Sequence, residues 1–242
     1  MSIENYSPKI EKQETLTYTL DVTLHRHGPK EGDSGPLSKE GREDSGEYYR
    51  ENYEGVTVGT TEVVHSGLDR ASETGEVFER EVDTLNELNS PQRDQRLSEG
   101  TISEHPELRE EYGGKGGRWL KGWLNAEERV DGVKTGQEAL GDLKSFITDK
   151  LEVAQEEGGS IEIDAFTHAP VMAALLLSLD RQFSTGFLSE NWEEENIIHT
   201  KLPYLSTLTV RLESEHADEA TVYFQGKSAT VPRSFFTKYL SS

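Results

Sequence analysis

Four side chains in this sequence combine a possible nucleophile with groups that bind phosphate. Arg26 and His27 follow a short apolar segment, and Arg70 and His168 lie just after two later ones. A neutral imidazole can attack phosphorus through one ring nitrogen when the other nitrogen donates its hydrogen to a fixed acceptor. The planar guanidinium of arginine binds phosphate oxygens in pairs, and charge on those oxygens must be held through the transition state. These residue types indicate phosphoryl transfer, with His27 as the nucleophile.

The predicted strands and helices alternate, and each of these residues lies where a strand gives way to a helix. From their β-branched and apolar content, strands are predicted over residues 18–24, 61–65 and 160–166. From capping residues and apolar spacing, helices are predicted over residues 38–52, 69–82, 135–157 and 169–179. Such alternation is typical of an α/β fold with a mostly parallel sheet, whose ligand site lies at the carboxyl ends of the strands. The fold would therefore bring His27, Arg70 and His168 together.

The remaining segments are less regular. Residues 83–133 are expected to form a small cap inserted over the sheet, with Trp119 and Trp123 covering the core. Residues 1–16 are polar and are expected to be a loose leader. Later strands are expected ahead of a short charged tail, over residues 205–212 and 221–225.

The composition limits what this chain can bind. The 46 acidic and 25 basic residues give a net charge of −21, which opposes non-specific binding to nucleic acids or anionic membranes. The absence of cysteine excludes disulfides, thiolate zinc sites and cysteine nucleophiles. The first residues lack the apolar core of a secretory signal, and the run VMAALLLSL is too short to cross a bilayer. We expect a cytoplasmic protein with one domain over residues 1–242 and no nucleic-acid or membrane partner.

Five segments follow one another in an order that is specific in combination. They read LHRHG (residues 24–28), GPLSKEGR (35–42), HSGLDRASET (65–74), TGQE (135–138) and THA (167–169). In this order they resemble the RHG, PLTxxGxxQA, SxLxRAxxTA, GES and THG motifs of the histidine phosphatase superfamily. The resemblance spans most of the chain, whereas an RHG motif alone would be weak evidence. It implies a phosphoglycerate mutase-like fold, which is a three-layer α/β sandwich.

The resemblance also implies a role for each candidate residue. His27 would become the phosphohistidine, and Arg26, Arg70 and a second catalytic histidine, His168, would form the phosphate pocket. Ala169 replaces the usual glycine of the last motif and still offers its backbone N–H. The implied activity is a phosphomonoesterase that acts on a small phosphate ester without a metal or another cofactor.

The proton donor to the leaving group is commonly a glutamate in an LxE segment of this family. Residues 96–99 (RLSE) resemble that segment, so Glu99 is the candidate general acid, with Glu104 and other nearby acids as alternatives. Residues 29–33 (PKEGD) and 100–102 (GTI) depart from the pattern of cofactor-dependent phosphoglycerate mutases. This departure favours a phosphatase over a phosphosugar mutase.

Two other functions fit parts of the pattern. One is a metal hydrolase, in which zinc or manganese would be bound by His25, His27, His65 and His168. This hypothesis leaves Arg26 and Arg70 unexplained, because their positive charges would repel a metal ion. We expect His25 and His65 to be structural instead. A non-catalytic module that binds a phosphorylated ligand is the other alternative, and a misplaced Glu99 would favour it.

Overall fold

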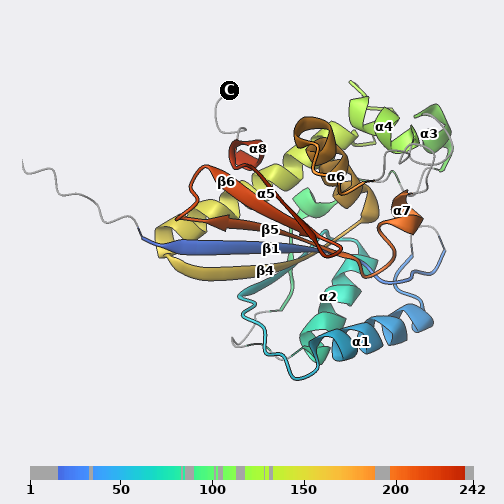
Figure 1. The fold of residues 1–242 in the computed structure, drawn as a ribbon. Helices are drawn as coiled ribbons and strands as arrows, with labels where there is room; N and C mark the ends of the chain where they lie inside the picture. Colours follow the sequence, from blue (N-terminus) through green and yellow to red (C-terminus); the bar gives the residue numbers. More distant parts are fainter. Residues whose placement is uncertain are drawn as a thin grey trace, which may run out of the picture.

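The central layer of the fold is a seven-stranded sheet. The computed structural model describes residues 16–32, 35–82, 84, 90–100, 102, 106–112, 118–127, 129–130, 133–188 and 197–237. Across them the strand order is β3-β2-β4-β1-β5-β6-β7, and helices cover both faces of the sheet (Figure 1). This three-layer α/β arrangement confirms the predicted fold class, but the sheet is mixed rather than mostly parallel, because β5, β6 and β7 pair in antiparallel.

Parallel strands form one half of the sheet and carry the predicted site. These strands are β1 (Tyr18–Arg26), β2 (Glu62–His65), β3 (Gln92–Arg93) and β4 (Gly159–Thr167). β4 lies between β1 and β2, with Arg26 opposite Thr167 and His65 opposite Phe166. The His27 N–H extends this register, because it donates to the Thr167 carbonyl at 3.2 Å. The residues that follow β1, β2 and β4 therefore lie at the same edge of the sheet.

The other half of the sheet is antiparallel and contains a strand that the sequence analysis missed. It consists of β5 (Thr207–Glu213), β6 (Glu219–Phe224) and β7 (Lys227–Pro232), with β5 paired to β1. β7 and α8 (Ser234–Thr237) follow residue 225, where the sequence analysis named no strand or helix. Gln225 and Gly226 have φ values of 48° and 74°, which suit the two-residue turn of a tight hairpin.

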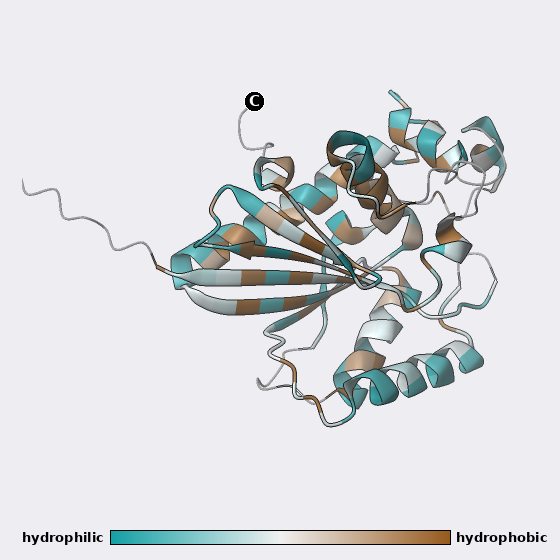
Figure 2. Cartoon of the chain, viewed as in Figure 1, coloured by the Kyte–Doolittle hydropathy of each residue, from teal (hydrophilic) through white to brown (hydrophobic). Residues whose placement is uncertain are grey.

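The helices are divided between the two faces of the sheet. α1 and α2 lie on one face, and α4, α5, α6 and α8 lie on the other (Figure 1). Their bounds are α1 (Lys39–Tyr53), α2 (Asp69–Glu81), α4 (Arg118–Asn125), α5 (Gly136–Glu157) and α6 (Ala169–Phe183). The shorter turns are η1 (Gln95–Leu97), α3 (Pro106–Glu111) and α7 (Ile197–Thr200). Figure 2 shows that α1 is largely hydrophilic and α6 largely hydrophobic, which agrees with the burial of α6 on nearly all sides.

Two tryptophans tie the expected cap region to the main core. Trp119 and Trp123 in α4 are 5% and 0% exposed, and their ring centroids lie 6.2 Å apart. Both belong to the large apolar cluster that includes α5 and α6, which confirms that they cover the core.

Of the expected loose leader, residues 1–15 lie outside the described residues. Within the described ranges, no helix is long and apolar enough to cross a membrane.

Candidate active site

His27 is held in the tautomer that a nucleophile needs. It follows β1 and is buried, with 5% of its surface exposed. Its Nδ1 lies 2.7 Å from the Gly28 carbonyl oxygen, and Arg70 Nε lies 3.2 Å from its Nε2. A carbonyl can only accept a hydrogen bond and a guanidinium can only donate, so Nδ1 carries the hydrogen and Nε2 the lone pair. His27 therefore has its lone pair on Nε2, the atom through which such a ring could attack.

The surroundings of His27 also keep its ring neutral. Burial lowers the pKa of His27 well below its ordinary value of 6.5, and the nearby Arg70 lowers it further. The hydrogen bond to the Gly28 carbonyl acts in the opposite direction, and Arg26 and Lys30 add smaller lowering effects. An imidazole that stays neutral in this way could act as a nucleophile at neutral pH without a separate base.

Arg70 joins the nucleophile to the candidate acid. It is the second residue of α2 and is 1% exposed. While its Nε faces His27, its Nη2 donates to Glu99 Oε1 at 3.2 Å, and the Glu99 side chain is also 1% exposed. Glu99 is thus not a solvated surface carboxylate. Glu104, the alternative acid, lies outside the described residues.

His168 lies beside His27 and uses one of its ring nitrogens to bind Ser66. The two ring centroids are 5.2 Å apart, and His168 Nε2 lies 2.6 Å from Ser66 Oγ. Nδ1 of His168 is buried and makes no hydrogen bond within the described part of the chain. If the Ser66 hydroxyl donates to Nε2, Nδ1 carries the hydrogen and can donate to a phosphoryl oxygen. Ala169 opens α6, and N–H groups in a first helical turn have no partner within the helix.

Arg26 is turned toward α7 and the segment that follows it. Its Nη1 donates to the carbonyl of Ile198 at 2.8 Å and also to that of Leu202, and its guanidinium lies 4.2 Å from the Tyr204 ring centroid. Burial lowers the pKa of Arg26 to about 10, so the group stays charged at neutral pH. Its Nε is buried and makes no hydrogen bond to any residue that the structure describes. Arg26 can therefore offer Nε to an anion while Nη1 fixes the neighbouring segment.

Three residues of the site were not singled out from the sequence. Ser66 and Thr74 lie in the HSGLDRASET segment, which is the signal that would have found them. Thr74 Oγ1 accepts from the Gly28 N–H at 3.1 Å and donates to the Arg70 carbonyl at 2.6 Å, so it ties the loop after β1 to α2. Tyr204, whose ring centroid lies 5.7 Å from that of His27, had no comparable signal.

Two glycines are required by close approach rather than by backbone conformation. Neither Gly28 nor Gly41 has a positive φ. A Cβ at Gly28 would lie 2.3 Å from Ser45 Oγ, and one at Gly41 would lie 1.9 Å from the Pro29 carbonyl oxygen. α1 therefore packs directly against the loop that follows His27, and these glycines permit that contact.

The histidines of the metal-hydrolase hypothesis do not form a ligand set. His25 Nε2 lies 2.6 Å from Asp164 Oδ1, and its ring stacks on Phe166 with centroids 4.7 Å apart. His65 Nδ1 accepts from the Gly67 N–H at 3.2 Å. Among the described residues, no group of three or more His, Cys, Asp and Glu side chains is arranged to hold a metal ion. His25 is structural, as expected, because its ring is buried in an aromatic cluster.

Solved structures share this fold at low sequence identity. A mycobacterial hydrolase superposes with a TM-score of 0.54 over 87% of this chain and 100% of its own, at 16% identity. A mycobacterial glucosyl-3-phosphoglycerate phosphatase gives 0.53 over 80% of this chain and 90% of its own, at 16% identity. A phosphoglycerate mutase from Bacillus anthracis str. Sterne gives 0.55 over 93% and 99%, at 13% identity. No protein-family profile and no curated protein sequence matches the chain. The chain therefore has a phosphoglycerate mutase-like fold.

The buried histidines predict a specific dependence on pH. Since the folded-state pKa values of His27 and His168 lie well below the ordinary 6.5, both rings should stay neutral as the pH falls from about 8 to about 6. At a pH between the folded and the unfolded pKa of these histidines, the unfolded chain binds more protons than the folded one. These residues should therefore make the free energy of unfolding fall as the pH is lowered below about 6.5. Nitrogen NMR of the assigned imidazoles, with the urea-unfolded protein as the control, measures both states. Protonation of folded His27 near its ordinary pKa would contradict the prediction.

Proposed function

We propose that this chain is a metal-independent phosphatase that hydrolyses small phosphate monoesters through a covalent phosphohistidine on His27. The observation that carries the proposal is the orientation of His27, whose Nδ1 is tied to a carbonyl while its Nε2 faces the guanidinium of Arg70. The proposed nucleophilic atom, His27 Nε2, thus lies directly beside a cation that can bind phosphate, the Arg70 guanidinium. We place this activity in a single cytoplasmic domain.

The first half of the reaction would transfer the phosphoryl group to the protein. The phosphate would enter between Arg70 and His27, and Nε2 would form a bond to phosphorus as the ester P–O bond breaks. Arg70, Arg26 Nε and His168 Nδ1 would hold the equatorial oxygens. Glu99 would give its proton to the departing alkoxide, which leaves as an alcohol.

The second half would return the protein to its starting state. The Glu99 carboxylate would accept a proton from a water molecule as the water oxygen attacks the phosphohistidine. The N–P bond then breaks, inorganic phosphate leaves, and His27 regains its lone pair on Nε2. Glu99 is protonated again, so atoms and charge balance over one turnover.

The position of Glu99 supports turnover over the non-catalytic binding module. A misplaced acid would favour a binder, but Glu99 is buried and ion-paired to Arg70, which in turn contacts His27. The sequence after the RHG motif argues against a phosphosugar mutase. The neighbours of similar fold include a phosphatase and a mutase of small phosphorylated compounds, which suits a small phosphate ester as substrate.

Hydrolysis of p-nitrophenyl phosphate with and without EDTA tests the proposed function. The intact protein should be active in both conditions, because no step uses a metal ion. His27→Ala should lose essentially all turnover, because the P–N bond cannot form. Loss of activity in EDTA would favour a metal hydrolase, and saturable phosphate binding without turnover on a broad substrate panel would favour the binding module.

Arg70 offers a second prediction with a matched control on the same helix. Arg70→Ala should lower kcat/KM by about a hundredfold or more, because it removes a buried donor to the transition-state oxygens. Arg80 lies in the last turn of α2, and its side chain is 63% exposed. Arg80→Ala should leave kcat/KM nearly unchanged. Equal effects of the two substitutions would show that Arg70 has no special role.

A further inference from the structure

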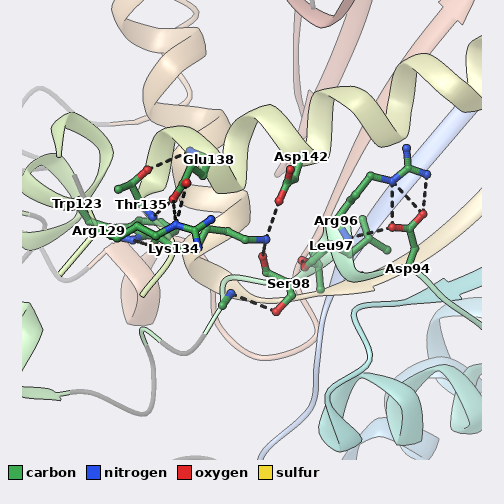
Figure 3. A network of polar contacts seen from close by, with 12 residues as sticks. Asp94, Arg96, Leu97, Ser98, Trp123, Arg129, Lys134, Thr135, Glu138 and Asp142 are labelled. Atoms are coloured by element: carbon green, nitrogen blue, oxygen red, sulfur yellow. Dashed lines mark hydrogen bonds and ion pairs between the residues drawn. The ribbon is translucent and has the colours of Figure 1, made fainter. Parts of the chain in front are cut away.

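The segment that carries Glu99 is fixed by contacts on both sides of the acid. Before it, the Leu97 carbonyl accepts from Thr167 Oγ1 at 2.6 Å, at the end of β4. Next to it, the Ser98 carbonyl accepts from Lys134 Nζ at 3.0 Å (Figure 3). After it, the Gly100 N–H donates to Ser98 Oγ at 3.1 Å. Lys134 therefore holds the peptide between residues 98 and 99 from outside the segment.

Besides its bond to Ser98, Lys134 contacts Trp123 and Asp142. Its carbonyl accepts from Trp123 Nε1 at 2.7 Å, and its Nζ also lies 2.7 Å from Asp142 Oδ2 in α5 (Figure 3). The next residue, Thr135, caps α5 in a reciprocal capping box with Glu138, as its sequence predicts. The Lys134 side chain is 16% exposed, so its ammonium is largely withdrawn from solvent. The lysine is therefore a fixed donor rather than a mobile surface charge.

Lys134 also packs closely on the residue after Glu99. Gly100 has a φ of 69°, and a Cβ at this position would lie 2.9 Å from the Lys134 Cβ. The stem of the lysine thus fills the space beside Gly100 while its ammonium binds Ser98. These two contacts bracket the acid along the main chain.

A rotation of this peptide would move the acid. The Glu99 carboxyl is buried against Arg70, and proton transfer requires a donor within hydrogen-bond reach of the leaving oxygen. Supporting contacts must hold such a group to within about half an ångström. A charge-assisted bond to the Ser98 carbonyl restrains the peptide that leads directly into Glu99.

We propose that Lys134 is a positioning residue that holds Glu99 in place through the Ser98 carbonyl, a role that rests on the proposed function. Lys134 does not touch the substrate. Its removal should weaken the acid step while leaving nucleophilic attack by His27 intact. The loss should therefore depend on how much protonation the leaving group needs.

Two esters that differ mainly in leaving-group basicity provide the test. p-Nitrophenyl phosphate releases a weakly basic phenolate, whereas p-nitrobenzyl phosphate releases a strongly basic alkoxide of similar size. Glu99→Gln should lower kcat on the benzyl ester far more than on the phenyl ester. Lys134→Met should show the same selectivity, with a loss of about tenfold on the benzyl ester and less than about threefold on the phenyl ester. Lys134→Arg should restore most of the benzyl activity.

Two further variants separate positioning from general stability. Arg129 forms an ion pair with Glu138 at the same end of α5, so Arg129→Met should leave both esters unchanged. The double variant with Glu99→Gln and Lys134→Met should lose no more benzyl activity than Glu99→Gln alone, because both act on one step. If Lys134→Met fails to fold, Asp142→Asn carries the same test, since it releases the ammonium and should show a smaller selective loss.

The outcomes distinguish this inference from the proposed function. Equal losses on the two esters in Lys134→Met, or additive losses in the double variant, would overturn the positioning role. The absence of selectivity in Glu99→Gln would overturn it as well. Full activity in His27→Ala would instead refute the proposed function. An inactive His27→Ala together with an unselective Lys134→Met would overturn the inference alone.

Discussion

A buried chain of hydrogen bonds from the Gly28 carbonyl through His27 and Arg70 to Glu99 is the constraint on which the rest of the site depends. Burying a guanidinium without a partner is costly, and the Arg70 guanidinium is tolerated because it donates to Glu99 Oε1. The same guanidinium donates to His27 Nε2, so the hydrogen of the His27 ring lies on Nδ1. The orientation of His27 and the burial of Glu99 thus both depend on Arg70.

The fold assembles this chain from segments that are distant in sequence. The parallel register of β1, β2 and β4 brings their ends to one edge, where Thr74 ties the loop after β1 to α2. Thr167 at the end of β4 ties the Glu99 segment to the same edge. In a chain with a net charge of −21, the positive charge of Arg26 and Arg70 is local, so it can select an anion without attracting polyanions in general.

Much of this arrangement was predictable because strand-to-helix junctions of a parallel sheet must meet. That rule places His27, Arg70 and His168 together, and the RLSE segment indicated Glu99. The contacts of Arg26 with Tyr204 and the carbonyls near α7 were not predictable, because they join segments about 170 residues apart without a shared pattern. β7 was missed because glutamine before glycine is a weak signal for a hairpin turn.

Whether phosphorus becomes bonded to His27 during turnover is the question on which the mechanism stands. The protein would be mixed with p-nitrophenyl phosphate, quenched in alkali within one turnover, and analysed by peptide mass spectrometry and phosphorus NMR. We expect one phosphoryl group on Nε2 of His27, stable in alkali and lost in acid, as is typical of a phosphoramidate. Turnover with no phosphoryl group on the protein, or with that group on another residue, would contradict the mechanism.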